Sequence, residues 1–175
     1  MTDRPPLANV ALAFLTVIQE PTGWVGGYLV TNAWGRPLEF RLTSAVQPNR
    51  VQTVLYGPTL AEYLHADVIG KALVEKTSIR PDLIVTDCLP MLGLRSRIEI
   101  PVIGILKDDP VDAATFTNPR SSEPLLLPAR YASDEAVVTA RLEAVDPAVD
   151  LAEPFDRIRE AVAEARKMGV ASRAA

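Results

Sequence analysis

The stretch 26–57 constrains the fold more than any other part of this chain. In its second half, Leu38, Phe40 and Leu42 alternate with charged or polar residues. A period of two is typical of a β-strand with one buried side. Residues 28–31, with the sequence YLVT, are rich in side chains that favour strands. The stretch therefore predicts two strands that pair as a hairpin.

The residues between these strands predict the turn. Asn32 opens a type I turn well, and Gly35 supplies the positive φ that closes a bulged hairpin loop. Trp34, at the tip, has two interpretations: it folds back onto its own sheet, or it is a partner-binding anchor, because Trp is enriched at interface hot spots. Gly26 and Gly27, before the hairpin, indicate either a bend or a close approach of another backbone.

Composition bounds the class of protein. With 175 residues, 48% of them apolar, we expect one globular domain with a sizeable core. The net charge of −4 makes nucleic acid an unlikely partner, because nucleic-acid binding relies on phosphate contacts. No apolar run reaches the roughly 18 residues of a membrane span. The start MTDRPP lacks the features of a secretory signal, so a cytoplasmic protein is expected.

Cys88 and His65 are the only residues of their types. A single cysteine excludes an intramolecular disulfide and a thiolate zinc cluster, and a single histidine excludes multi-histidine metal sites. The sequence also lacks a phosphate loop, a dinucleotide-binding glycine pattern and a serine nucleophile elbow. We therefore expect no cofactor, a packed thiol at Cys88, and a half-exposed His65.

Apolar runs and boundary residues predict the remaining elements of the first half. Val10–Ile18 reads as a buried strand, although periodicity alone also allows a helix, and it gives three consecutive antiparallel strands. Asn49 or the residue before it can cap a helix that stops at Gly57. The apolar stripe of the following helix changes phase near Ala66, which predicts a kink or two shorter helices.

The second half alternates between apolar runs and helical patterns. Residues 83–87 and 102–106 are short continuous apolar runs of the kind that form buried parallel strands. Stretch 107–123 is polar and rich in proline, which predicts a surface loop. We expect a short helix within 88–99, an edge strand within 124–131, helices beginning at 133 and near 154, and flexible ends at 1–6 and 170–175. The last helix has one apolar stripe, formed by Phe155, Ile158, Val162, Ala165 and Met168, and the charge pairs along 153–167 indicate a solvated face. The predicted fold is a single α/β domain with C-terminal helices.

The run RPDLIVTDCLPMLGLRSRIEIPVIGILK, residues 80–107, resembles a known nuclease segment. In endonuclease V and in the C-terminal nuclease half of UvrC-type proteins, PDLxxxDG ends one central strand and IPxIGxxK forms the next. The order of three strands, a helix and two parallel strands resembles the ribonuclease H-like fold. The hairpin and the LYGPTL segment also resemble conserved, uncharacterised bacterial proteins, a likeness that implies no function.

The nuclease resemblance implies a role for Asp87, which matches the metal-binding carboxylate at a strand end. Such nucleases hold two Mg²⁺ ions about 4 Å apart with several carboxylates. They also carry an aspartate in the middle of the first strand, where this chain reads VALAFLTVIQE and has Glu20 as its nearest acid. The glycine that follows the strand-end aspartate is Cys88 here.

These departures favour a non-catalytic binding or scaffold protein on a ribonuclease H-like fold, with a protein partner at Trp34. The alternative is a divalent-metal nuclease or phosphodiesterase with Asp87 and Glu20 as catalytic residues. Under that alternative, Asp87, Asp108 and Asp109 bind Mg²⁺ or Mn²⁺, which prefer oxygen ligands. A third interpretation is a small-ligand module, for which a pocket has to be lined by Tyr28, Trp34 and Phe40.

Overall fold

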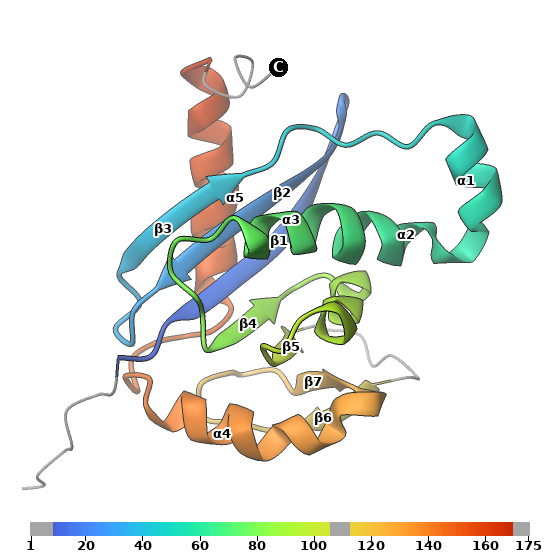
Figure 1. The fold of residues 1–175 in the computed structure, drawn as a ribbon. Helices are drawn as coiled ribbons and strands as arrows, with labels where there is room; N and C mark the ends of the chain where they lie inside the picture. The colour runs from blue at the N-terminus through green and yellow to red at the C-terminus, as the bar shows by residue number, and fades with distance from the viewer. Residues whose placement is uncertain (1–8, 106–112, 170–175) are drawn as a thin grey trace, which may run out of the picture.

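A mixed sheet of seven strands forms the centre of the computed structural model, which describes residues 9–105 and 113–169 (Figure 1). The strand order is β3-β2-β1-β4-β5-β7-β6. The strands are β1 (Leu12–Glu20), β2 (Gly23–Thr31), β3 (Pro37–Leu42), β4 (Leu83–Thr86), β5 (Val102–Ile105), β6 (Ala113–Phe116) and β7 (Leu125–Pro128). Strands β1 to β5 follow the element order expected from the resemblance, and the predicted α/β class is confirmed.

The predicted hairpin is β2 and β3, which pair antiparallel with a bulge between Val30 and Thr31. In the turn, Asn32 Oδ1 accepts hydrogen bonds from the backbone nitrogens of Trp34 and Arg36, each at 3.0 Å. Gly35 has the expected positive φ of 80°. Because β3 is the edge of the sheet, its apolar face is only partly covered: Leu38 and Phe40 stay 47% and 40% exposed.

Strands β4 and β5 run parallel to β1 and are buried along their whole length, as their continuous apolar runs predict. The far side of the sheet differs from the prediction. Strand β6 lies inside the stretch predicted as a loop, and β7, predicted as an edge strand, lies between β5 and β6. Residues 113–116 lack an alternating pattern, so their strand depends on pairing with the apolar Leu125–Pro128 run.

One face of the sheet is covered by the second half of a helical stretch that spans residues 50–75, whereas the first helix of this stretch buries none of its residues. The stretch comprises α1 (Arg50–Tyr56), the 3-10 turn η1 (Gly57–Thr59), α2 (Leu60–Glu62), the π-helix η2 (Tyr63–Gly70) and α3 (Lys71–Glu75). The π-helix explains the phase change near Ala66, because its wider turn adds one residue and rotates the stripe. Residues predicted as one short helix form the 3-10 segment η3 (Leu89–Arg97) on the same side.

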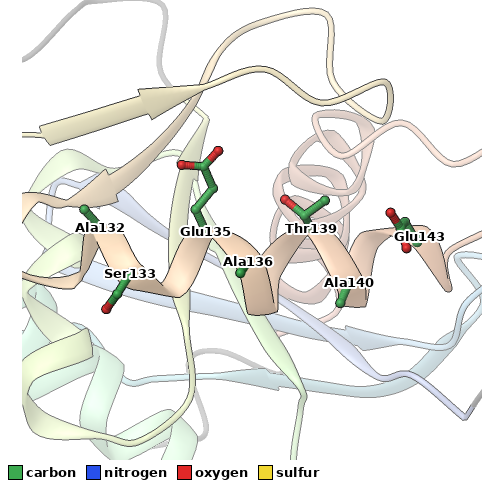
Figure 2. A pocket seen from close by; sticks show the side chains of 7 residues that line it. All are labelled: Ala132, Ser133, Glu135, Ala136, Thr139, Ala140 and Glu143. Carbon is green, nitrogen blue, oxygen red and sulfur yellow. The ribbon is translucent and has the colours of Figure 1, made fainter.

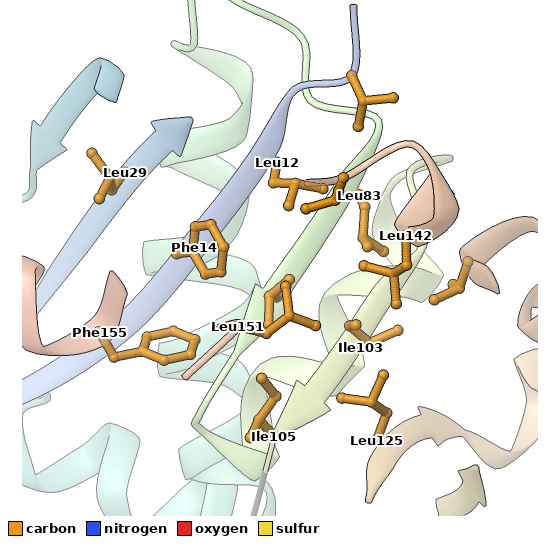
Figure 3. Packing of buried hydrophobic residues seen from close by; sticks show 14 of the residues in the cluster. Leu12, Phe14, Leu29, Leu83, Ile103, Ile105, Leu125, Leu142, Leu151 and Phe155 are labelled. Carbon is orange, nitrogen blue, oxygen red and sulfur yellow. The ribbon is translucent and has the colours of Figure 1, made fainter. Parts of the chain in front are cut away.

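The opposite face is covered by the 3-10 segment η4 (Ala129–Asp134) with α4 (Glu135–Glu143), and by α5 (Glu153–Lys167). Figure 1 shows α5 running along β1 and β2 on the side away from α2 and α3. The stripe of α5 that the sequence predicted buries Phe155, Ile158 and Val162. Figure 3 shows Phe155 beside Phe14 of β1, and their ring centroids are 5.7 Å apart in an edge-to-face arrangement.

Gly26 and Gly27 bring both helical layers close to β2. A Cβ atom on Gly26 would overlap the side chain of Ile69 in η2, and one on Gly27 would overlap that of Ile158 in α5. Successive residues of a strand point to opposite faces, so two adjacent glycines admit one helix on each side. The pair is therefore neither a bend nor a place where another backbone approaches: both glycines lie inside β2, and the atoms nearest to each missing Cβ belong to side chains.

No helix in the described residues is both long and apolar enough to cross a membrane.

Candidate functional site

Asp87 directly follows β4 and points to the face of the sheet that α5 covers. The register places Leu15 of β1 opposite Thr86, so Asp87 comes level with Thr16. Its carboxylate forms an ion pair with Arg159 of α5, and its side chain is 19% exposed. The expected strand-end carboxylate is thus present, but it is bound to a cation of the protein itself.

Glu20, the last residue of β1, lies on the same face and pairs with Arg166 of α5. Its side chain is 11% exposed. Along β1, Glu20 lies four residues beyond Thr16, which is the residue level with Asp87. Four residues of a strand span about 13 Å. The two arginines are seven residues apart, about 10 Å along the helix. The structure therefore places both acids on one face without bringing them together.

Asp108 and Asp109 lie outside the described residues. Within residues 9–105 and 113–169, no group of three or more His, Cys, Asp or Glu side chains is arranged to hold a metal ion. The middle of β1, where the nuclease resemblance implies an aspartate, presents the buried Thr16 on the α5 face.

Cys88 is a packed thiol, as the sequence predicted. Its Sγ lies 3.8 Å from Thr16 Oγ1 and donates a hydrogen bond to Asp87 Oδ1 at 3.4 Å. Burial, and then the negative charge of Asp87, raise the pKa of the thiol to about 11. At neutral pH the side chain is therefore a neutral thiol, which is a poor nucleophile.

His65 is buried rather than half-exposed, because the π-helix turns it toward the sheet. Its Nδ1 lies 2.7 Å from the carbonyl oxygen of Ala61, and its ring centroid is 5.6 Å from that of Trp24. Burial lowers its pKa below the usual 6.5. The imidazole is neutral at physiological pH and serves the packing of this layer.

Trp34 is 57% exposed at the tip of the hairpin. It borders a hollow of about 460 Å³ between the hairpin and the segment that joins α4 to α5. Backbone and side-chain hydrogen bonds fix the tip there: Arg157 donates to the carbonyl of Gly35 at 2.8 Å, and the backbone of Asp146 donates to that of Ala33 at 2.9 Å. The indole is thus held on a rigid support with much of its surface open to solvent.

The small-ligand interpretation required Tyr28, Trp34 and Phe40 to share a pocket. Tyr28 is fully buried beneath the layer formed by η2 and α3. Phe40 pairs with Leu29, whose side chain belongs to the core on the α5 side. The structure does not bring the three side chains together.

A shallow hollow of about 500 Å³ also runs along α4. Figure 2 shows that Glu135, Thr139 and Glu143 point one way from the helix, and that Ser133, Ala136 and Ala140 point the other way. Polar groups therefore do not converge in this hollow, and it offers no arrangement for chemistry.

Sequence reasoning missed Arg159 and Arg166, because charges along the last helix were interpreted as a solvated face. A signal was present: the spacing i, i+7 places both arginines on one side of a helix. Nothing in the sequence, however, indicated that this side lies over the ends of β1 and β4.

Comparisons with known proteins give a structural likeness but no family. No protein-family model matches the chain, and no curated protein matches it. Among solved structures, endonuclease V from Bacillus subtilis is similar with a TM-score of 0.48 and 13% sequence identity, over 90% of this chain and 83% of that chain.

Proposed function

We propose that this chain is a non-catalytic binding or scaffold protein that uses its α/β fold as an interaction platform. The observation that carries the proposal is the pairing of Asp87 with Arg159 and of Glu20 with Arg166. Metal-dependent phosphoryl transfer needs several carboxylate oxygens around ions about 4 Å apart. Here the two acids lie about 13 Å apart along β1, and each is neutralised by an arginine of α5.

The partner is a protein that docks on Trp34. An exposed tryptophan on a rigid support supplies a large contact area at little cost in conformational entropy, which is why Trp is frequent at interface hot spots. The hollow beside the indole is bordered by Asp146, Asp150 and Glu153, with Arg157 as its one basic residue. Its negative charge suits a partner segment that carries basic side chains, which can stack on the indole.

The first test is a calorimetric titration of Mn²⁺ into the wild type and into Asp87→Asn, with cleavage assays on DNA, RNA and an activated phosphodiester. We expect no saturable binding and no turnover in either protein. Saturable binding that disappears in Asp87→Asn, together with metal-dependent turnover, would overturn the proposal.

The rival function is a divalent-metal nuclease or phosphodiesterase. It is favoured by the place of Asp87 at the carboxyl end of β4, beside β5, where ligands of open α/β sheets collect. Asp108 and Asp109 follow β5 closely in the sequence. The rival predicts that Asp87→Asn and Asp108→Asn each abolish metal-dependent cleavage, whereas Met168→Ala, at an exposed site on the end of α5, leaves it intact.

The binding role is tested separately by affinity capture with the wild type, Trp34→Ala and Met168→Ala as baits. Met168 is 75% exposed, so its variant controls for the loss of a large apolar side chain at another surface site. We expect a protein that is retained by the wild type and Met168→Ala and lost with Trp34→Ala. Equal retention by all three baits would rule out Trp34 as the anchor.

A further inference from the structure

A groove lies between α3 and the end of β3, and we call it the β3–α3 groove. Its volume is about 510 Å³, which is within the range of pockets that bind small molecules. One side of the groove is apolar and the other side is polar. A lining that is divided in this way suits a ligand with an apolar body and a polar head.

The apolar side is formed by Val46, Val68, Ala72 and Leu73. Leu73 is buried, and the other three side chains are half-buried. The position of Val46 is fixed, because its backbone exchanges two hydrogen bonds of 2.8 Å each with the backbone of Trp24 in β2. The apolar surface is therefore formed in the protein alone and can cover a hydrocarbon or aromatic group.

Arg41 and Lys76 supply the positive charges of the polar side. The Nε of Arg41 pairs with Glu39, and its Nη2 donates a hydrogen bond to Ser78 Oγ at 3.2 Å. Within the described part of the chain, neither Arg41 Nη1 nor Lys76 Nζ has a hydrogen-bond partner. Two cationic donors are thus available for an anion, and the guanidinium is already held in one orientation by its neighbours.

Two hydroxyl groups complete the polar side. Thr43 Oγ1 accepts a hydrogen bond from the backbone nitrogen of Gly26 at 2.8 Å, so its own proton remains available for a ligand. Ser44 is exposed, and its hydroxyl has no partner among the described residues. No acidic side chain is among the described residues that line the groove. The lining therefore offers several donors to an anion and no negative charge of its own.

We propose that the β3–α3 groove binds a small organic monocarboxylate, with the carboxylate between Arg41 and Lys76 and the apolar body on Val68 and Ala72. A guanidinium presents its donors in a fixed fork that fits a carboxylate. Glu39, which is 10% exposed, balances the charge of Arg41, so Lys76 leaves one positive charge at the groove. One positive charge matches a singly charged ligand better than a doubly charged phosphate ester.

Calorimetric titration of the full chain with octanoate tests this proposal, and 1-octanol is the comparison because it has the same apolar body and no charge. We expect saturable binding of octanoate with a Kd below about 1 mM, and an affinity for octanol that is at least about fivefold lower. Octyl phosphate should bind no more tightly than octanoate. Equal affinities for octanoate and octanol would overturn the proposal, as would the lack of saturable octanoate binding or tighter binding of octyl phosphate.

Three variants locate the ligand. Lys76→Gln should raise the Kd for octanoate about fivefold and leave that for octanol unchanged, because only the charged head contacts this side chain. Ala72→Leu fills the apolar side and should weaken the binding of both compounds. Lys71→Gln is the matched control, because Lys71 lies on the same helix, is 47% exposed and does not line the groove.

Thermal unfolding verifies that each variant remains folded. Octanoate binding that Lys76→Gln and Ala72→Leu both leave unchanged would place the ligand elsewhere and overturn the proposal. So would an equal loss of affinity in Lys76→Gln and Lys71→Gln. The hollow beside Trp34 shares no lining residue with this groove, so a negative result here leaves the proposed function standing.

Discussion

The Glu39 carboxylate ties the edge strand β3 to the turn after α3. It accepts hydrogen bonds from Thr77 Oγ1 at 2.9 Å and from the backbone nitrogens of Ser78 and Ile79 at 3.0 and 3.1 Å, and it pairs with Arg41. Burial alone raises the pKa of the carboxyl. The hydrogen bonds outweigh burial and lower the pKa from the usual 4.5 to about 2. One side chain thus satisfies several backbone donors that otherwise face the edge of the protein.

Glu39→Gln should therefore change stability in a pH-dependent way. In the unfolded chain the carboxyl takes up a proton near pH 4.5, whereas in the folded protein it stays ionised to about pH 2. The stability from Glu39 is present above pH 5 and is lost as the pH falls toward 2. We expect Glu39→Gln to lower the free energy of unfolding by about 2–3 kcal/mol at pH 7 and to be close to the wild type at pH 2.

Urea unfolding at several pH values between 2 and 7 measures this difference. Glu75→Gln is the control, since the Glu75 side chain is 63% exposed and its pair with Lys71 is long, at 3.8 Å. We expect that variant to follow the wild type within about 0.5 kcal/mol across the range. A difference between wild type and Glu39→Gln that does not vary with pH would contradict the assigned role of the carboxylate.

At the scale of elements, the helix α5 has two roles. Its apolar stripe packs on β1 and β2, and two of its three arginines, Arg159 and Arg166, neutralise acids at the ends of β4 and β1. The two ion pairs differ in burial: Asp87 is 19% exposed beside Arg159, and Glu20 is 11% exposed beside Arg166. The same substitution at both arginines can therefore separate the effect of burial from that of charge.

Arg166→Gln should destabilise the protein more than Arg159→Gln. Removal of Arg166 leaves the more buried carboxylate of Glu20 without its ion pair, which costs about 1–2 kcal/mol. Removal of Arg159 breaks a pair whose arginine is 48% exposed, at a cost below about 1 kcal/mol. Chemical unfolding at pH 7 measures both changes, and each variant controls for the other because the helix propensities are matched. A larger cost for Arg159→Gln would contradict this ranking.

Replacement of Gly27 by alanine should destabilise the packing of α5, and replacement of Gly26 by alanine should destabilise the packing of η2 on the other face. A methyl group at Gly27 overlaps Ile158 of α5, and one at Gly26 overlaps Ile69 of η2. Overpacking of this kind costs about 1–3 kcal/mol. We expect amide hydrogen exchange to become faster in α5 for Gly27→Ala and in η2 and α3 for Gly26→Ala. If either variant speeds exchange equally in both layers, the contacts of the two layers with β2 are not independent.

Elements with a strong local pattern could be predicted from the sequence. The alternation around Phe40 and the stripe through Phe155 each gave the correct element, because burial of one face imposes a period. Strand β6 could not be predicted in this way, since its pairing partner and not its own pattern defines it. The same reason applies to the candidate site: Asp87 was found from a local motif, whereas its partner Arg159 lies 72 residues away.

At the scale of the whole molecule, one sheet separates two apolar cores. One core lies under η2, α3 and η3, and the other under α4 and α5. Strand β1 contributes to both, with Phe14 on one side and Leu15 on the other. A strand shared in this way makes each core depend on the other, so we predict a single cooperative unfolding transition.

Phe155→Leu tests this cooperativity. The substitution leaves a cavity against Phe14 and should cost about 1–2 kcal/mol. Trp24 lies against the other core, so its fluorescence, measured in a Trp34→Phe background, reports the far side of the sheet. We expect its unfolding midpoint to shift together with the circular dichroism of the helices. Two separate midpoints would mean that the layers unfold independently.

The π-helix at Tyr63–Gly70 makes the length of this chain critical at one place. A wide turn of this kind is equivalent to one extra residue inserted into an α-helix. Removal of a single residue there would restore regular helical hydrogen bonds and improve the local geometry. It would also rotate every later position by about 100°, so that Leu73 would leave its place in the core and the smaller Val74 would move into it. The helix would gain regularity and this core would lose packing, so a deletion between these two residues should destabilise the chain.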